Sequence, residues 1–409
     1  MANNRKAAVG FIFFTLVLDI IGLGIIIPVI PQLIEQLLGT HDISKASIYA
    51  GWLTFLYATM QFIFAPFIGS LSDKYGRRPV LLISLFGFGL DYLFLAFAPS
   101  ILFLFIGRAI SGIAGASITT ATAYIADISD DTNRAQNFGM IGAAFGIGFI
   151  IGPMLGGVLG EFGPRIPFLV AAGLALINTL YGYFVLPESL DKEHRRNFEW
   201  KRANPLGALS HFKKYPAVIG LVVALAFIYL AAHAVQSNWS FANIEKFNWT
   251  PKIIGLSLGL VGLLVSLVQG LLIRYINPKL GNEKSVYFGL LLYAIGLILF
   301  AFATSTWMMF AFLVPYCLGG IAGPALQSII SAHVPKNEQG ELQGSLTSVM
   351  SVTSIIGPLI MTNLFAYFTN PKHTIYFPGA SFLLGAVFML FSAFIAYSVL
   401  KDEPSSVKA

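Results

Sequence analysis

Arg108 is a fixed positive charge within a long apolar run, residues 104–112. A cation in a membrane-spanning helix costs at least ~2.5 kcal/mol, so it is expected to face an acid or water. Asp19 and Asp91 also lie in apolar runs, and counting along ideal helices places all three side chains at a similar depth. For such an acid, burial favours the neutral form and a nearby cation favours the charged form. Competition between these two effects suits proton coupling, and a permanently ionised structural pair is the alternative.

The composition predicts a helical membrane protein. Of 409 residues, 56% are hydrophobic and 11% charged, with 36 Phe and 40 Gly, whereas soluble domains carry roughly 25% charged residues. The apolar runs are continuous and long enough for helices, which need ~20 residues per span, and a β-barrel is excluded because its strands alternate. The single Cys317 excludes an internal disulfide and is interpreted as a packing residue.

Hydropathy predicts twelve transmembrane helices. The first apolar run is too long for a signal peptide and is kept as the first span. The predicted spans are 8–36, 47–71, 79–97, 100–126, 135–160, 166–186, 216–240, 253–273, 285–303, 306–331, 342–368 and 376–399.

The basic residues predict the orientation of these spans. With both termini in the cytoplasm, 19 Lys and Arg fall in inner segments and 5 in outer ones, and Arg108 lies within a span. This bias predicts cytoplasmic termini. It also accounts for the net charge of +6 without a nucleic-acid partner.

The two halves of the chain repeat each other. Residues 1–186 are predicted to form one six-helix bundle, 187–215 a solvated cytoplasmic linker of mixed charge, and 216–409 a second six-helix bundle. The matches are Lys74-Tyr75-Gly76 with Lys279-Leu280-Gly281, Gly139 with Gly344, Ile151-Gly152-Pro153 with Ile356-Gly357-Pro358, and Gly112-Ile113-Ala114-Gly115 with Gly320-Ile321-Ala322-Gly323. Two parallel repeats typify major facilitator transporters, with a midplane site and alternating access. The predicted fold class is therefore an all-α polytopic membrane protein with twelve helices in two pseudo-symmetric bundles.

The loop between the second and third spans, residues 69–79, contains acidic and basic residues between glycines. Anchoring by positive charge alone is one interpretation. The loop also resembles the signature loop of the major facilitator superfamily, which latches the cytoplasmic side. The residues that the resemblance assigns to this conformational latch are Gly69, Asp73, Gly76, Arg77, Arg78 and, at the end of the fourth span, Asp127.

The fifth span carries small residues four apart, Gly148, Gly152 and Gly156, with Pro153 and Gly157 alongside. This spacing places small residues on one helix face, so a second backbone can approach closely. The run also resembles a motif typical of antiporters in the superfamily, which favours export over uptake.

Across nearly the whole chain, and more strongly in the first half, the sequence resembles drug:proton antiporters of the tetracycline-resistance type. The resemblance places Asp19, Gln61, Asp91 and Tyr92 on the substrate and proton pathway, and Arg108 in the proton-coupling motif. Two positions depart from that group. Its essential acid in the ninth span and its histidine in the eighth align here with Ala294 and Val265, and the second half has no acid in any span.

The second half must therefore offer neutral polar groups to a substrate. Its candidates are His233, Gln236, Gln269 and Gln327. A histidine titrates near neutral pH, but His233 lies near a helix end, where a structural role is the alternative.

Export of small amphipathic drugs by a monomer in the cytoplasmic membrane is the leading hypothesis, with a proton gradient, or alternatively a sodium gradient, as the energy source. A proton-coupled symporter for a sugar or another metabolite is the alternative, and a membrane enzyme or non-transporting receptor is a third class. The sequence contains no H-E-x-x-H or phosphate-cradling motif. We therefore expect no metal, no cofactor, no ATP and no enzymatic activity, and the expected partners are the substrate, the proton and the lipid bilayer.

Overall fold

The computed structural model describes residues 2–115, 117–130, 133–196, 212, 215–335 and 338–401. Within these ranges the chain forms helices and connections, without a strand. Ten helical segments are long and apolar enough to span a membrane, and the bent pair Gly10–Ile25 and Ile30–Leu38 makes an eleventh. The segment Pro251–Phe302 is 52 residues long and is broken at Gly281. Because one span needs ~20 residues, this segment holds two. Counted in this way, by length and composition, the described residues hold a helical segment at each of the twelve predicted spans.

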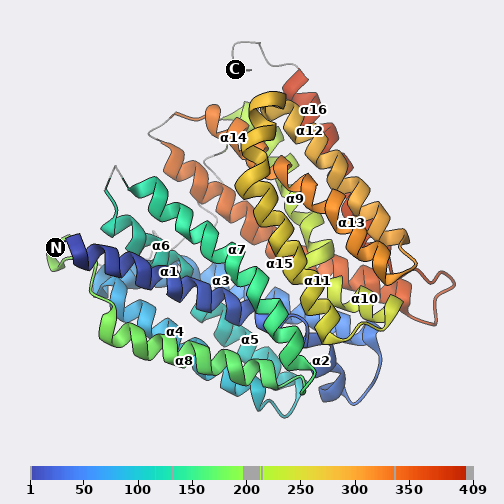
Figure 1. Ribbon diagram of the computed structural model, residues 1–409, viewed down its shortest axis with the longest axis horizontal. Coiled ribbons are helices and arrows are strands. Elements are labelled where there is room, and N and C mark those ends of the chain that lie inside the picture. The colour runs from blue at the N-terminus through green and yellow to red at the C-terminus, as the bar shows by residue number, and fades with distance from the viewer. Residues whose placement is uncertain are drawn as a thin grey trace. The chain divides into compact units, whose positions relative to one another are not determined.

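The helices of the first half follow the predicted spans closely (Figure 1). They are α1 (Ala2–Ile25), α2 (Ile30–Leu38), α3 (Ile43–Tyr75), α4 (Arg77–Ala96), α5 (Ile101–Gly115), α6 (Ser117–Ile128), α7 (Arg134–Gly160) and α8 (Ile166–Val185). The predicted first span is bent between α1 and α2, and the predicted fourth span comprises α5 and α6. A short 3-10 turn, Lys192–His194, follows α8.

The second half repeats this order. Its elements are α9 (Pro216–Gln236), α10 (Trp239–Phe247), α11 (Pro251–Leu267), a π-helical turn (Val268–Leu272), α12 (Ile273–Phe302), α13 (Thr306–Leu318), a 3-10 turn (Gly319–Ile321), α14 (Ala322–Ala332), α15 (Gln339–Thr369) and α16 (Ala380–Lys401). Most of the predicted linker, residues 197–211 and 213–214, lies outside the described residues.

The chain divides into two compact units. Unit 1 comprises Met1–His41, Leu56–Pro205 and Trp249–Gly262, and unit 2 comprises Asp42–Phe55, Leu206–Asn248 and Leu263–Ala409. In unit 1, α1 packs along α7 and α4 along α8, and in unit 2, α16 packs along both α9 and α12 (Figure 1). The predicted boundaries at 186 and 216 stay a prediction.

The backbone itself carries the internal repeat. Gly76 and Gly281 both have positive φ, 106° and 76°, at the reversals after the second and eighth spans. Gly39 and Asn248 end the short helices α2 and α10 with φ of 62° and 52°. A backbone with positive φ favours glycine and asparagine. This explains why both halves of the chain have glycine at the positions of Gly76 and Gly281.

Two of the five basic residues in predicted outer segments close helix ends. Arg165 donates to two carbonyl oxygens at the end of α4, at 2.7 and 2.9 Å. Lys246 Nζ donates to the carbonyl oxygens of Phe300 and Ala301 at the end of α12, both at 3.1 Å. Cations near helix C-termini satisfy exposed carbonyls and the helix dipole. Burial lowers the pKa of Lys246 to about 8. These charges thus have local structural roles.

Candidate functional site

Asp91 is the buried acid of unit 1. Its side chain, on α4, is 2% exposed, and Ser111 of α5 donates a hydrogen bond to its Oδ2. Its Oδ1 is buried without a hydrogen-bond partner. Gly107 allows this approach, because a Cβ there would lie 3.1 Å from Oδ1 and 2.5 Å from Leu95 Cδ2. The site therefore holds an acid with one oxygen bound and one open.

Arg108 lies one residue after Gly107 on α5. Its guanidinium carbon is 5.9 Å from the ring centroid of Tyr57 on α3, within the range of a cation–π contact. Its Nη2 is buried without a hydrogen-bond partner. No acid of the described residues lies within 4.0 Å of Arg108. The two expected acid partners, Asp19 and Asp91, therefore form no ion pair with Arg108.

Gln61 and Tyr92 complete this cluster, which we call the charged cluster (Asp19, Tyr57, Gln61, Asp91, Tyr92, Arg108 and Ser111). Gln61 Nε2 donates to the carbonyl oxygen of Gly115 at 3.1 Å. Tyr92 is 4% exposed, and a Cβ added at Gly22 of α1 would lie 3.0 Å from its hydroxyl oxygen. Because Gly22 follows Asp19 by one helical turn, Tyr92 reaches α1 close to that acid. Helices α1, α3, α4 and α5 thus converge on one polar region.

In unit 2 the predicted polar residues do not converge in this way. Gln327 donates to the Tyr229 hydroxyl at 3.0 Å. Gln269 Nε2 lies 3.8 Å from where a Cβ on Gly320 would be, with the Tyr293 hydroxyl at 3.9 Å from the same point. Gln269 itself is exposed.

His233 and Gln236 are separated from those amides. The buried His233 ring lies where a Cβ on Gly357 would be, so this histidine packs against the Ile-Gly-Pro repeat of α15. Gln236 is exposed at the end of α9. The alternative of a structural role for His233 agrees with this packing.

Arg77 organises the predicted latch at the α3–α4 turn. It contacts Asp73 at 2.5 Å and Asp127 at 3.1 Å, and its Nη1 donates to Ser72 at 2.6 Å. Arg77 is 8% exposed. Because α3, α4 and α6 each supply a member, these contacts fix the ends of three helices together.

The other latch residues lie on the same turn. Gly69 is half-buried and has no atom near its added Cβ position. Arg78 turns toward the end of α8, where its Nη2 donates to the carbonyl oxygen of Tyr183 at 2.6 Å and its guanidinium lies over the Tyr183 ring.

Glu188, which follows α8, contacts this turn although the sequence did not indicate this contact. Its Oε1 accepts hydrogen bonds from the backbone N–H groups of Arg77 at 2.8 Å and Arg78 at 3.4 Å. Its Oε2 lies 3.8 Å from Arg195 Nη2, and both groups occupy the space of a Cβ at Gly76. A carboxylate at a helix N-terminus satisfies free N–H groups and the helix dipole. The first residues of the predicted linker are therefore docked on the turn, which differs from the expectation of a solvated segment.

The small residues of α7 face two neighbouring helices. Cβ atoms at Gly148, Gly152 and Gly156 would meet the side chain or backbone of α1, and Pro153 packs against Gly24 there. On another face, a Cβ at Gly157 would lie 2.6 Å from the carbonyl oxygen of Pro251 in α11. Small residues on α7 thus lie where the backbones of α1 and α11 approach closely.

Known proteins resemble this chain over most of its length. The family description Major Facilitator Superfamily matches residues 12–279 and 226–409. The tetracycline resistance protein class C of Escherichia coli is 38% identical over 390 residues, which are 95% of this chain and 96% of that protein. This chain belongs to the major facilitator superfamily.

Within the superfamily, tetracycline-type members recur among the relatives. The class E protein of Escherichia coli is 39% identical over 350 residues, 85% of each chain. The solved structure of a bacterial homologue of the human lysosomal transporter Spinster shares the fold, with a TM-score of 0.81, 15% identity and coverage of 98% of this chain and 99% of that one. The predicted family and fold class are confirmed.

The two apolar positions that the sequence analysis singled out lie in unit 2. Ala294 of α12 is 2% exposed. Val265 of α11 is half-buried. A metal-binding group of three or more His, Cys, Asp or Glu side chains is absent from the described ranges.

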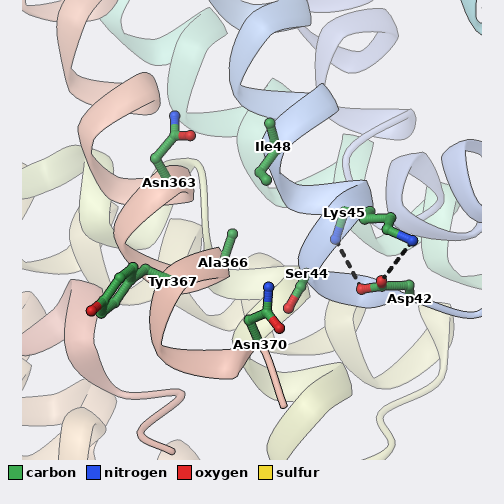
Figure 2. A pocket seen from close by; sticks show the side chains of 8 residues that line it. All are labelled: Asp42, Ser44, Lys45, Ile48, Asn363, Ala366, Tyr367 and Asn370. Atoms are coloured by element: carbon green, nitrogen blue, oxygen red, sulfur yellow. Dashed lines mark hydrogen bonds and ion pairs between the residues drawn. The ribbon is translucent and has the colours of Figure 1, made fainter. Parts of the chain in front are cut away.

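Unit 2 of this transporter also has a polar surface pocket of about 250 Å³. Figure 2 shows the pocket between the first turns of α3 and the last turns of α15, with the Asp42–Lys45 ion pair, 3.3 Å between charged atoms, on one side. Its lining residues are Asp42, Ser44, Lys45, Ile48, Asn363, Ala366, Tyr367 and Asn370. Apart from that neutralised pair the lining carries no charge, and it does not include the charged cluster.

Proposed function

We propose that the chain is a proton-driven antiporter that exports small amphipathic drugs of the tetracycline type. One observation carries the proposal: Asp91 and Arg108, on the packed helices α4 and α5, each keep a buried polar atom without a hydrogen-bond partner. Unpaired buried groups are costly, so they persist where function uses them. The class of substrate is taken from the names of the relatives, which match this chain over 85% or more of its length.

In this mechanism Asp19 and Asp91 exchange protons with the two sides of the membrane. Ionised Asp91 attracts Arg108, whereas protonation releases the guanidinium to other partners. Because substrate and proton would compete for the same cluster, proton binding from one side would favour drug release there. The latch residues Asp73, Arg77 and Asp127 would then hold the cytoplasmic side during half of the cycle.

The substrate contacts proposed for unit 2 are neutral. Gln269 and Gln327 supply amide groups, and Tyr229 and Tyr293 supply hydroxyls and ring faces. Amides and aromatic faces suit a polycyclic amphipathic drug. Since the predicted spans of the second half contain no acid, we propose that a second membrane acid takes no part in recognition.

The remaining parts of the proposal concern the setting. The protein would reside in the cytoplasmic membrane as a monomer with both termini in the cytoplasm, and it would perform no enzymatic reaction. Cys317 is the single cysteine and is buried, so a Cys317→Ser background permits orientation to be tested with cysteines at Lys192 and Lys372. Reagents confined to the cytoplasmic side should label the first position and not the second, and labelling of position 372 alone would reverse the orientation.

The transport test uses proteoliposomes with an imposed pH gradient. Tetracycline and ethidium uptake is measured for the wild type, Asp19→Asn, Asp91→Asn and the control Asp42→Asn, whose half-buried side chain lies outside the charged cluster. We expect gradient-driven uptake in the wild type and control, and a fall of about tenfold or more for the two membrane variants. Wild-type vesicles that move neither compound would refute drug export. Undiminished transport by both Asn variants would refute the proton-coupling role.

A further inference from the structure

Tyr57 makes a cation–π contact with Arg108. Its ring covers the guanidinium at 5.9 Å, and its hydroxyl oxygen lies 3.5 Å from Gln61 Nε2. The same amide nitrogen donates to the carbonyl oxygen of Gly115 at 3.1 Å. Two groups therefore hold the tyrosine. The Arg108 cation lies over its ring face, and an amide that is hydrogen-bonded to α5 lies at its hydroxyl.

The glycines of α5 make room for this arrangement. A Cβ at Gly112 would lie 2.5 Å from the carbonyl oxygen of Tyr57 and 2.7 Å from Met60 Cβ. A Cβ at Gly115 would lie 2.8 Å from the Tyr57 hydroxyl oxygen. Such distances exclude any larger residue without a shift of α3. The segment Arg108–Gly115 thus encodes both the cation and the space for the ring that holds it.

The second half of the chain supports reading the two residues as a pair. Gln61 matches Gln269 at the spacing of 208 that relates Gly112 to Gly320. At the same spacing, Tyr57 becomes Val265 and Arg108 becomes Tyr316. The aromatic ring in α3 and the cation in α5 are therefore both missing from the half that also lacks membrane acids.

We propose that Tyr57 is the positioning residue for Arg108. A cation is attracted to the face of an aromatic ring, and this contact uses none of the N–H groups on the guanidinium edge. The ring therefore holds the charge in place while Nη2 stays available to an acid or to a substrate oxygen. Without the ring, Arg108 relaxes onto the open Oδ1 of Asp91 and locks that acid in its charged form. This role rests on the proposed proton-coupled transport.

The transport experiment compares Tyr57→Phe with Tyr57→Leu, and Phe64→Leu is the control. Phe64 lies two turns further along α3, and its aromatic contact is with Phe67. We expect Tyr57→Phe to keep turnover within about threefold of wild type, because the ring remains. Tyr57→Leu should lower turnover about tenfold, with KM nearly unchanged and a shifted pH profile. Equal loss in the Phe and Leu variants, or a wild-type pH profile in Tyr57→Leu, overturns the proposal.

A second measurement separates this proposal from the question of the transported drug. Melting temperatures of the detergent-solubilised chain are measured for Tyr57→Leu, Arg108→Gln and the double variant. If the residues act through each other, the double variant melts no lower than the less stable single variant. Additive losses in melting temperature overturn the positioning role even if tetracycline is transported. If the wild type fails to transport the drug while the losses are non-additive, the proposed function fails and the Tyr57–Arg108 contact stands.

Discussion

Replacing Glu188 by alanine should loosen the α3–α4 turn. The change removes the acceptor for the Arg77 and Arg78 backbone N–H groups at the start of α4. It also removes the group 3.8 Å from Arg195. A helix cap contributes about 0.5–2 kcal/mol, and the side chain of Glu188 is 28% exposed, so we expect a loss of about 1–2 kcal/mol in the local opening free energy. That loss corresponds to a 5–30-fold change in the opening equilibrium, by the order-of-magnitude relation between energy and population.

The assay is amide hydrogen exchange by mass spectrometry on peptides that cover residues 74–82. Glu188→Ala should raise exchange there by the same factor, and Glu188→Gln, which keeps an uncharged acceptor, should raise it less. Glu193→Ala is the matched control, because that acid is exposed in the same segment. Equal exchange in Glu188→Ala and Glu193→Ala would refute the capping role.

Three further perturbations test other parts of the account. Asp73→Ala, which breaks the 2.5 Å contact to Arg77, should slow turnover while the drug Kd stays nearly unchanged, and a large loss of affinity at normal turnover would contradict the latch. Gly156→Ala should destabilise the protein by about 1–3 kcal/mol, because the added Cβ meets the Ile25 backbone. Gly173→Ala, with open space around the added Cβ, should not destabilise it. Equal unfolding curves for the two variants would show that α1 and α7 can move apart at little cost. Burial lowers the pKa of Lys246 from 10.5 to about 8. Between pH 8 and 10.5 the unfolded chain therefore binds more protons than the folded chain, so the free energy of unfolding should rise with pH. Lys246→Met should flatten this rise relative to the control Lys372→Met, and identical pH dependences of the two variants would contradict the role of Lys246.

Much of the fold could be predicted because the membrane imposes a simple rule on the sequence. Apolar runs of the necessary length mark the spans, and α7 begins and ends within one residue of its predicted range, 135–160. The breaks after Ile25 and Leu318 were not predicted. Each lies in an apolar, glycine-containing run, where hydropathy does not distinguish a continuous helix from a bent one.

The candidate site was only partly predictable. Residue types predicted that Arg108 faces Asp19 or Asp91, since an isolated charge in a span needs a partner, but no described acid lies within 4.0 Å of it. Counting residues along a helix predicts the depth of a side chain in the membrane, but it predicts poorly which helix face the side chain occupies. The contact of Arg108 with the Tyr57 ring therefore came from the structure. Glu188 was missed for another reason: its segment has mixed charge, which is typical of solvated linkers.

The direction of proton movement during drug transport distinguishes an antiporter from a symporter. Proteoliposomes with no pH gradient are loaded with tetracycline and diluted, so that drug flows outward through the protein, and the internal pH is followed with a dye. The account predicts that outward drug flow moves protons inward and acidifies the lumen, and that Asp91→Asn abolishes the signal. Alkalinisation of the lumen, with protons leaving alongside the drug, would show a symporter and contradict the proposed antiport.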